Sequence, residues 1–317
     1  MHEIFDLTKR PNEEVFYRSP FEDDPRIGGK ATFRPENYDA SDIVIVGCPQ
    51  DEGIVREGGR AGAASAPDAI RRQFYRLTTF GVDKHIFDLG DVIIGPTLEY
   101  THERLREVAA AALRDGKRLI VLGGGGDISY ADGSAMAETY GNDNWIAVNI
   151  DGHLDVRTSK ERTAETQFRN LLDEKKLRPD YFYEAGYQTH HTSPIHYEYI
   201  RGLGVNRISL EQLRSRAEAD LELKEQIRRK LVHHSSSLNV FFSFDMDAVR
   251  SADAPGVTTP SPLGLRAGEF IQLVKFAGSL SNTKIVEFTD VSPDYDFDDC
   301  TTKLVAIGMH RICSARA

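Results

Sequence analysis

Cysteine is scarce in this chain of 317 residues, and the few cysteines show no framework spacing. They are Cys48, Cys300 and Cys313, an odd number that includes no CxxC pair. Small disulfide-built domains carry an even number of cysteines, whereas reducing compartments keep isolated thiols free. We therefore expect three free thiols and a cytoplasmic location.

Long apolar runs and excess positive charge are also lacking. No stretch approaches the roughly 18 apolar residues of a membrane span, and the first residues contain no apolar segment of a signal peptide. The chain has 39 Lys and Arg against 49 Asp and Glu, a formal net charge of -10. Nucleic acids and anionic membranes bind basic faces, so we expect neither as a partner.

Short apolar runs alternate with helical patterns after an irregular N-terminal arm, residues 1–40. The runs that predict buried strands are Ile43–Gly47, His85–Leu89, Arg118–Leu122, Trp145–Ile150, Tyr181–Ala185, Val205–Ile208, Val240–Phe244 and Ile285–Phe288, and the clearest helices are Ala66–Leu77, Glu103–Arg114, Ala219–His233 and Thr301–Arg311. This alternation predicts an α/β protein with a mostly parallel sheet of about eight strands. The pattern allows an open three-layer α/β/α sandwich or a closed barrel. No linker divides residues 41–317, which we interpret as a single domain.

Three residues that commonly bind metals follow the apolar run Trp145–Ile150. Asp151, His153 and Asp155 are spaced by two, so in an extended segment their side chains share one side. Clustered carboxylates cannot all stay charged in a protein interior without cations among them. The spacing therefore predicts a metal site.

A second acidic pair, Asp245 and Asp247, follows the run Val240–Phe244. Parallel sheets place ligand sites at the carboxyl ends of their strands, so the two groups are expected to meet. Four carboxylates and one imidazole favour Mn²⁺ or Mg²⁺ over Zn²⁺, and the imidazole favours Mn²⁺. Five donors exceed the needs of one tetrahedral ion, which favours two ions. The alternative is that these acids only cap helices and turns.

These segments resemble those of the arginase, agmatinase and formiminoglutamase family, and most closely the formiminoglutamase branch. The resemblance covers about residues 40–312 and is strongest in Arg60–Arg71, Asn149–Asp155, Ser243–Val257, Pro260–Leu265 and Val291–Leu304. It implies an open α/β/α sandwich, two Mn²⁺ ions per chain, and hydrolysis of linear amidine or guanidine C–N bonds by a metal-bound hydroxide. Formiminoglutamate would give glutamate and formamide. Trimers and hexamers occur in the family, so a homo-oligomer is expected by analogy.

The resemblance also implies roles for individual residues. Asp151 and Asp245 would bridge the two ions. Asp155 would complete one ion position, orient the nucleophile and relay its proton. His153 and Asp247 would complete the other position.

Two positions depart from the family pattern. Gly126 stands where a histidine normally binds the first ion, so that ion is expected to be weakly held or absent. Asp127 is one position off and is not expected to replace the histidine. Asp290 stands where arginases carry a glutamate that grips the guanidinium, and we interpret it as a catalytic and substrate-binding residue, with a strand-end cap as the alternative.

Two arginines are candidates for binding the carboxylates of a substrate. Arg157 and Arg250 each lie a few residues beyond a metal-binding segment, in loops expected to overhang the pocket. The alternative for both is a solvent-exposed surface role.

Two other functional classes remain in view. The run Gly123–Gly126 is typical of a phosphate-binding loop, but no lysine follows it and neither nucleotide-binding motif is completed. We therefore expect no nucleotide cofactor. The main rival is a repurposed family member whose metal centre has begun to erode at Gly126, with weak hydrolysis or none, or with activity on another guanidino substrate.

Overall fold

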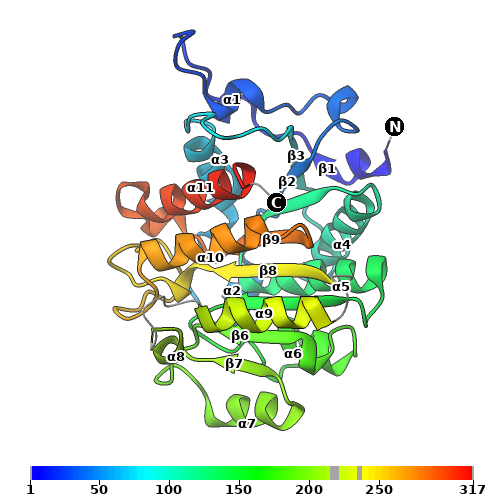
Figure 1. Cartoon of the computed structure of the whole chain (residues 1–317), viewed down its shortest axis with the longest axis vertical. Coiled ribbons are helices and arrows are strands. Elements are labelled where there is room, and N and C mark those ends of the chain that lie inside the picture. Colours follow the sequence, from blue (N-terminus) through cyan, green and yellow to red (C-terminus); the bar gives the residue numbers. More distant parts are fainter. Residues whose placement is uncertain (1, 215–220, 234–237, 316–317) are drawn as a thin grey trace.

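A single nine-stranded sheet forms the centre of the molecule (Figure 1). The computed structural model describes residues 2–214, 221–233 and 238–315. The strands are β1 (Thr8–Lys9), β2 (Ile43–Gly47), β3 (Ile86–Val92), β4 (Arg118–Leu122), β5 (Trp145–Ile150), β6 (Phe182–Ala185), β7 (Asn206–Ile208), β8 (Asn239–Asp245) and β9 (Thr283–Thr289). Their order across the sheet is β1-β3-β2-β4-β9-β8-β5-β6-β7. Every pairing is parallel except that of β1 with β3.

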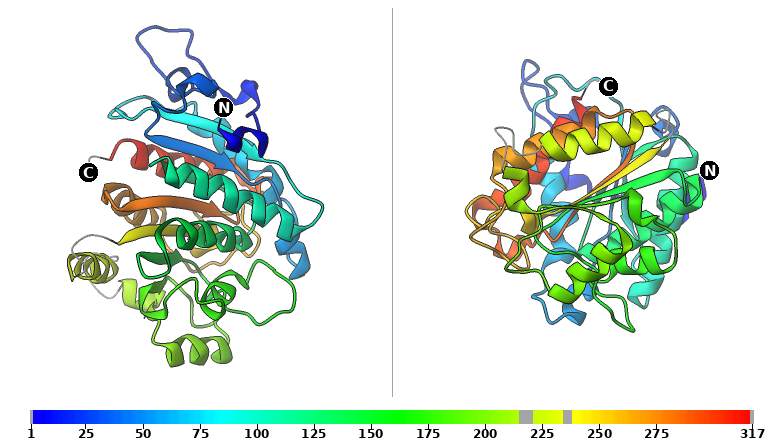
Figure 2. Two further views of the ribbon diagram at one scale, coloured as in Figure 1. Left: turned by 90° about the vertical axis from the view of Figure 1, so that its right-hand side faces the viewer. Right: turned by 60° about the horizontal axis from the view of Figure 1, so that its bottom comes forward.

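Helices cover both faces of this sheet (Figure 2). They are α1 (Ile27–Lys30), α2 (Glu52–Arg56), α3 (Ala66–Phe74), α4 (Leu98–Arg114), α5 (Ser129–Tyr140), α6 (Gln167–Asp173), α7 (Pro194–Leu203), α8 (Leu210–Arg214), α9 (Leu221–His233), α10 (Ala267–Ser279) and α11 (Cys300–Cys313). Helices α3, α10 and α11 pack together in one layer, and α4, α5 and α6 in the other. The fold is therefore the open α/β/α sandwich.

The sheet does not close into a barrel. Its edge strands β1 and β7 each pair with a single neighbour, so the barrel alternative is wrong. The sheet has one strand more than the eight that the sequence predicts. The additional strand is β1, whose two residues are too few to form an apolar run.

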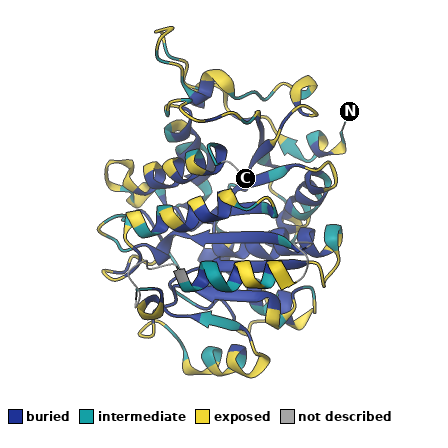
Figure 3. Ribbon diagram, in the orientation of Figure 1, coloured by how far each residue is buried: buried dark blue, intermediate teal, exposed yellow. Residues whose placement is uncertain are grey.

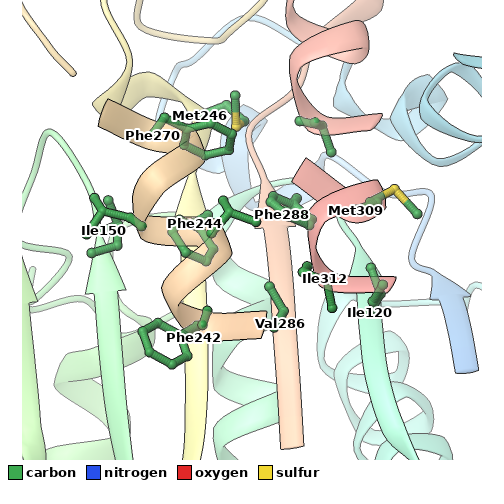
Figure 4. Close-up of a cluster of buried hydrophobic side chains, with 14 of the residues drawn as sticks. Ile120, Ile150, Phe242, Phe244, Met246, Phe270, Val286, Phe288, Met309 and Ile312 are labelled. Carbon is green, nitrogen blue, oxygen red and sulfur yellow. The ribbon is translucent and has the colours of Figure 1, made fainter. Parts of the chain in front are cut away.

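The central strands are buried (Figure 3), and their apolar side chains alternate between the two faces of the sheet. In β2, Ile43 and Ile45 join the core beneath α3 and α11, whereas Val44 and Val46 join the core beneath α4 and α5. Because both faces are covered, central strands are apolar at nearly every position. Figure 4 shows the first core, where the aromatic rings of β8 and β9 pack against α10 and α11.

Several predicted elements differ from the observed ones at their ends. Helix α3 stops at Phe74, three residues before the predicted end, and α4 starts at Leu98 behind Thr97, whose side chain accepts a hydrogen bond from the Tyr100 N–H. The predicted start of the helix at residues 219 and 220 lies outside the described residues. Among the described helices, none has the length and apolar character needed to span a membrane.

Candidate metal centre

The carboxyl ends of the central strands surround a cavity of about 210 Å³. Six residues that the sequence singled out line it, namely Asp151, His153, Asp155, Asp245, Asp247 and Asp290, together with Gly126. They come from the segments that follow β4, β5, β8 and β9, except that Asp245 is the last residue of β8. The parallel sheet thus brings together residues up to 164 positions apart in the chain.

Asp151 and Asp245 lie next to one another at the ends of adjacent strands. Strands β5 and β8 are in register up to Ile150 and Phe244, so the two aspartates follow side by side. The Thr289 hydroxyl donates to Asp245 Oδ2 at 3.0 Å, which helps to fix that carboxylate. In the two groups of close donor atoms, Asp151 belongs to one and Asp245 to the other, and Asp247 is common to both.

His153 is held between two carboxylates. Its Nδ1 lies 2.8 Å from Asp247 Oδ2 and 3.6 Å from Asp151 Oδ1. The negative charge of Asp247 raises the pKa of His153 well above its ordinary value, although burial opposes this. Burial alone would raise the pKa of Asp151. The hydrogen bond to His153 and the positive charge of that imidazole outweigh burial and lower the pKa to about 2. The three side chains therefore form a position that attracts positive charge.

Asp155 lines the same cavity as Asp151 and interacts with it. Burial raises the pKa of Asp155 well above its ordinary value, and the charge of Asp151 raises it further. The Gln167 amide Nε2 donates a hydrogen bond to Asp155 Oδ2. Sequence reasoning missed Gln167, because it lies in a helix that begins 12 residues later and carries no motif.

Asp290 lies closer to Asp245 and Asp247 than substrate binding alone would require. Donor atoms of Asp245, Asp247 and Asp290 all lie within 4.8 Å of one another, as do those of Asp151, His153 and Asp247. Burial, followed by the charge of Asp247, raises the pKa of Asp290 to about 8. The Thr258 N–H donates to Asp290 Oδ2 at 3.0 Å and orients the carboxylate. Asp290 could therefore contact either a cation or a bound substrate.

Two aspartates of the cavity have strained backbones. Asp155 has φ 50° and Asp290 has φ 61°, in the left-handed region that residues other than glycine rarely adopt. Such conformations cost of order 1–3 kcal/mol each and cluster at functional sites. Their occurrence at two of the six acidic or imidazole positions supports a functional role for the cavity.

A buried polar row crosses the sheet beneath the cavity. Glu287, Ser243, Asn149 and Glu184 are register neighbours on four adjacent strands. The Ser243 hydroxyl donates to Glu287 Oε1 at 2.7 Å, and Asn149 Nδ2 donates to Glu184 at 3.3 Å and to Asp151 Oδ2 at 3.2 Å. This row explains why the two aspartate motifs begin with Asn and Ser, since both support the strand ends that carry the aspartates.

The donor set fits divalent cations. Burial raises the pKa of Asp245 well above its ordinary value, and the charges of Asp247 and Asp290 raise it further. Such crowding of buried carboxylates is relieved by cations, and oxygen donors with one imidazole suit Mn²⁺. The residues present could thus hold the ions that the sequence predicts.

The glycine turn after β4 packs against backbone. A Cβ on Gly124 would lie 1.5 Å from the carbonyl oxygen of Gln50, so only glycine fits at this crossing. Asp127 points away from the cavity, with Oδ2 at 2.7 Å from His102 Nε2 and accepting from Gln50 Nε2 at 2.6 Å. These contacts agree with the prediction that Asp127 does not replace the missing histidine.

The two candidate arginines both pair with acidic side chains, and the partners of Arg157 line the cavity. Arg157 Nε donates to Glu165 at 2.8 Å and lies 3.3 Å from Glu57, and both glutamates line the cavity. Arg250 makes two hydrogen bonds to Asp253, at 2.9 and 3.1 Å. Of the described residues, those that line the cavity include no lysine or arginine. Substrate binding by either arginine stays a prediction.

The chain has an open, mostly parallel α/β sheet, and buried carboxylates and one imidazole lie at the carboxyl ends of its strands. This combination defines the class of the protein as an α/β protein with a candidate metal centre. Residues 41–313 match the model of the arginase family. Formimidoylglutamase of Staphylococcus aureus (strain bovine RF122 / ET3-1) is 30% identical over 271 residues, 85% of each chain. Formimidoylglutamase of Staphylococcus haemolyticus is 29% identical over 279 residues, 86% of each chain. The chain belongs to the arginase family and is a hydrolase of that family.

Solved structures of related proteins share this fold. The structure of Trypanosoma cruzi formiminoglutamase with Mn²⁺ has a TM-score of 0.83 and 29% identity, covering 93% of this chain and 100% of that one. The formimidoylglutamase of Bacillus subtilis has a TM-score of 0.85, covering 94% of each chain, and at 24% identity it supports the fold alone. The expected sandwich and the expected family are both confirmed.

Proposed function

We propose that this chain is a manganese-dependent hydrolase of linear amidines that converts formiminoglutamate to glutamate and formamide. The observation that carries the proposal is the pair of overlapping donor groups at one cavity, in a chain similar over 85% of its length to formimidoylglutamases. The S. aureus and T. cruzi proteins carry that activity in their names, and the T. cruzi structure contains Mn²⁺.

Each predicted metal ligand has a role in this proposal. Asp151, Asp155 and Asp245 would hold one cation, and Asp151 and Asp245 would share the other with His153 and Asp247. When bound, the two cations lower the pKa of water and stabilise negative charge on the substrate.

Asp155 and Asp290 would act on the reacting groups. Asp155, buried and bonded to Gln167, would accept a proton from the attacking water and return it to the departing glutamate nitrogen. Water oxygen bonds to the formimino carbon, and the bond from that carbon to the glutamate nitrogen breaks. Asp290, fixed by Thr258, would accept hydrogen bonds from the amidinium.

Two glutamates that line the cavity favour a second class of substrate, the linear guanidines. Glu57 and Glu165 line the cavity, and Arg157 is the cation paired with both. A dicarboxylate substrate must compete with these glutamates for Arg157, whereas a linear guanidine without carboxylates need not. Assays of formamide release from formiminoglutamate and urea release from alkylguanidines distinguish the two. Release of formamide alone supports our proposal, and release of urea alone contradicts its substrate.

Asp290→Asn tests whether this residue binds substrate or metal. The amide removes the charge that pairs with an amidinium, so we expect KM to rise about tenfold to a hundredfold while two ions remain bound per chain. The measurements are steady-state kinetics and metal content on the same preparation. Loss of an ion with the change would assign Asp290 to the metal centre instead.

A further inference from the structure

Gln167 fills the space that the missing side chain of Gly126 leaves. It is the first residue of α6 and is only 1% exposed. A Cβ on Gly126 would lie 2.8 Å from Gln167 Nε2 and 3.4 Å from Asp155 Oδ2. The amide therefore lies beside the cavity, at the position from which a side chain of residue 126 would approach Asp155.

One end of this amide has a partner and the other has none. Nε2 donates to Asp155 Oδ2, whereas no described residue hydrogen-bonds to the buried Oε1. A buried oxygen without a partner is destabilising and calls for an explanation. The unpartnered atom belongs to a neutral oxygen donor adjoining a carboxylate of the candidate metal centre.

A cation at Asp155 would reverse the preferred orientation of this amide. The N–H end carries positive partial charge and suits a bare carboxylate, but it would be repelled by a cation bound there. The two ends of an amide have nearly the same shape, so a half-turn places the oxygen where the nitrogen was. Amide carbonyls are suitable ligands for Mn²⁺.

We propose that Gln167 Oε1 is a donor to the cation held at Asp155 and compensates for the absent side chain at position 126. This inference rests on the proposed metal-dependent function and names a residue of the same site. With this donor the first ion is expected to stay bound, because Gln167 of α6 would supply a neutral donor in place of the imidazole that is absent at position 126.

The test compares Gln167→Met with Gln167→Glu. Methionine keeps the length of the side chain without the amide oxygen, so we expect the affinity for one of two Mn²⁺ ions to fall at least about tenfold. Glutamate keeps an oxygen donor and should retain both ions. The measurements are Mn²⁺ content at limiting metal and the electron paramagnetic resonance signal of coupled ions, which an isolated ion lacks.

Gln188→Met is the matched control. This buried glutamine uses both ends of its amide, accepting from the Ser261 hydroxyl at 3.0 Å and donating to the Leu263 carbonyl at 3.2 Å. We expect it to leave two ions bound. A rescue follows from the shared space, since Gly126→His in a Gln167→Ala background should restore the second ion.

Several results would overturn the proposal. They are binding of both ions by Gln167→Met as tightly as by the parent or more tightly, loss of an ion from Gln167→Glu, and failure of the rescue. Metal content requires no turnover, so it separates this inference from the proposed reaction. A chain that loses an ion with Gln167→Met but hydrolyses no amidine would keep the inference and contradict the proposed function.

Discussion

Asp155→Asn is expected to lower kcat by about 10²- to 10⁴-fold, the usual contribution of a positioned acid or base. The asparagine has nearly the same shape and accepts the Gln167 hydrogen bond, but it cannot take a proton from water. In the metal-stripped chain thermal stability should be unchanged, because burial and the charge of Asp151 already raise the pKa of Asp155 and favour its neutral form. Steady-state rates and thermal unfolding of the same preparation measure both effects.

Asp143→Asn is the control for this change. Its side chain is 75% exposed and pairs with Arg178 far from the cavity. Its rate should equal that of the parent. Retention of more than a tenth of the parent rate by Asp155→Asn would remove Asp155 from the reaction.

The metal-free chain is expected to lose stability as pH rises from 6 to 9, whereas Mn²⁺ should stabilise it increasingly over the same range. Burial raises the pKa of Glu287 to about 7 and that of Asp290 to about 8. The native state thus holds protons that the unfolded chain has already released above about pH 4.5. These bound protons make their full contribution to the free energy of unfolding below about pH 4.5, and this contribution is lost as the pH rises through 7 and 8.

The size of this effect follows from linkage. Each such carboxyl lowers the free energy of unfolding by up to about 1.4 kcal/mol per pH unit. Mn²⁺ favours the deprotonated carboxylates, so its affinity rises with pH, and an excess of 100-fold over Kd adds about 2.7 kcal/mol. Thermal unfolding with and without Mn²⁺ at pH 6, 7, 8 and 9 should show a widening difference in Tm. A difference that stays constant would contradict carboxylates as the main ligands.

The central strands could be predicted from local pattern because both faces of the sheet are buried. Ile43–Gly47, Arg118–Leu122 and Trp145–Ile150 were predicted with the ends that the structure shows. Helix α5 has no such signal. It is buried along most of its length, so it lacks the polar face that marks an amphipathic helix.

The candidate site could be predicted only where its residues follow strands in motifs. Asp151 and Asp245 end adjacent strands, and parallel topology alone brings them together. Gln167 and Glu57 meet the site through the packing of distant segments, which no local spacing encodes. The roles of the arginines depend on loop conformation and are equally invisible to periodicity.

Formamide release from formiminoglutamate, followed as Mn²⁺ is returned to the metal-stripped chain, tests the proposed function most directly. We expect no release before metal is added, and a rate that increases with bound Mn²⁺ until the donor groups are filled. A chain that holds its full complement of Mn²⁺ yet releases neither formamide nor urea from any linear amidine or guanidine would contradict the proposal.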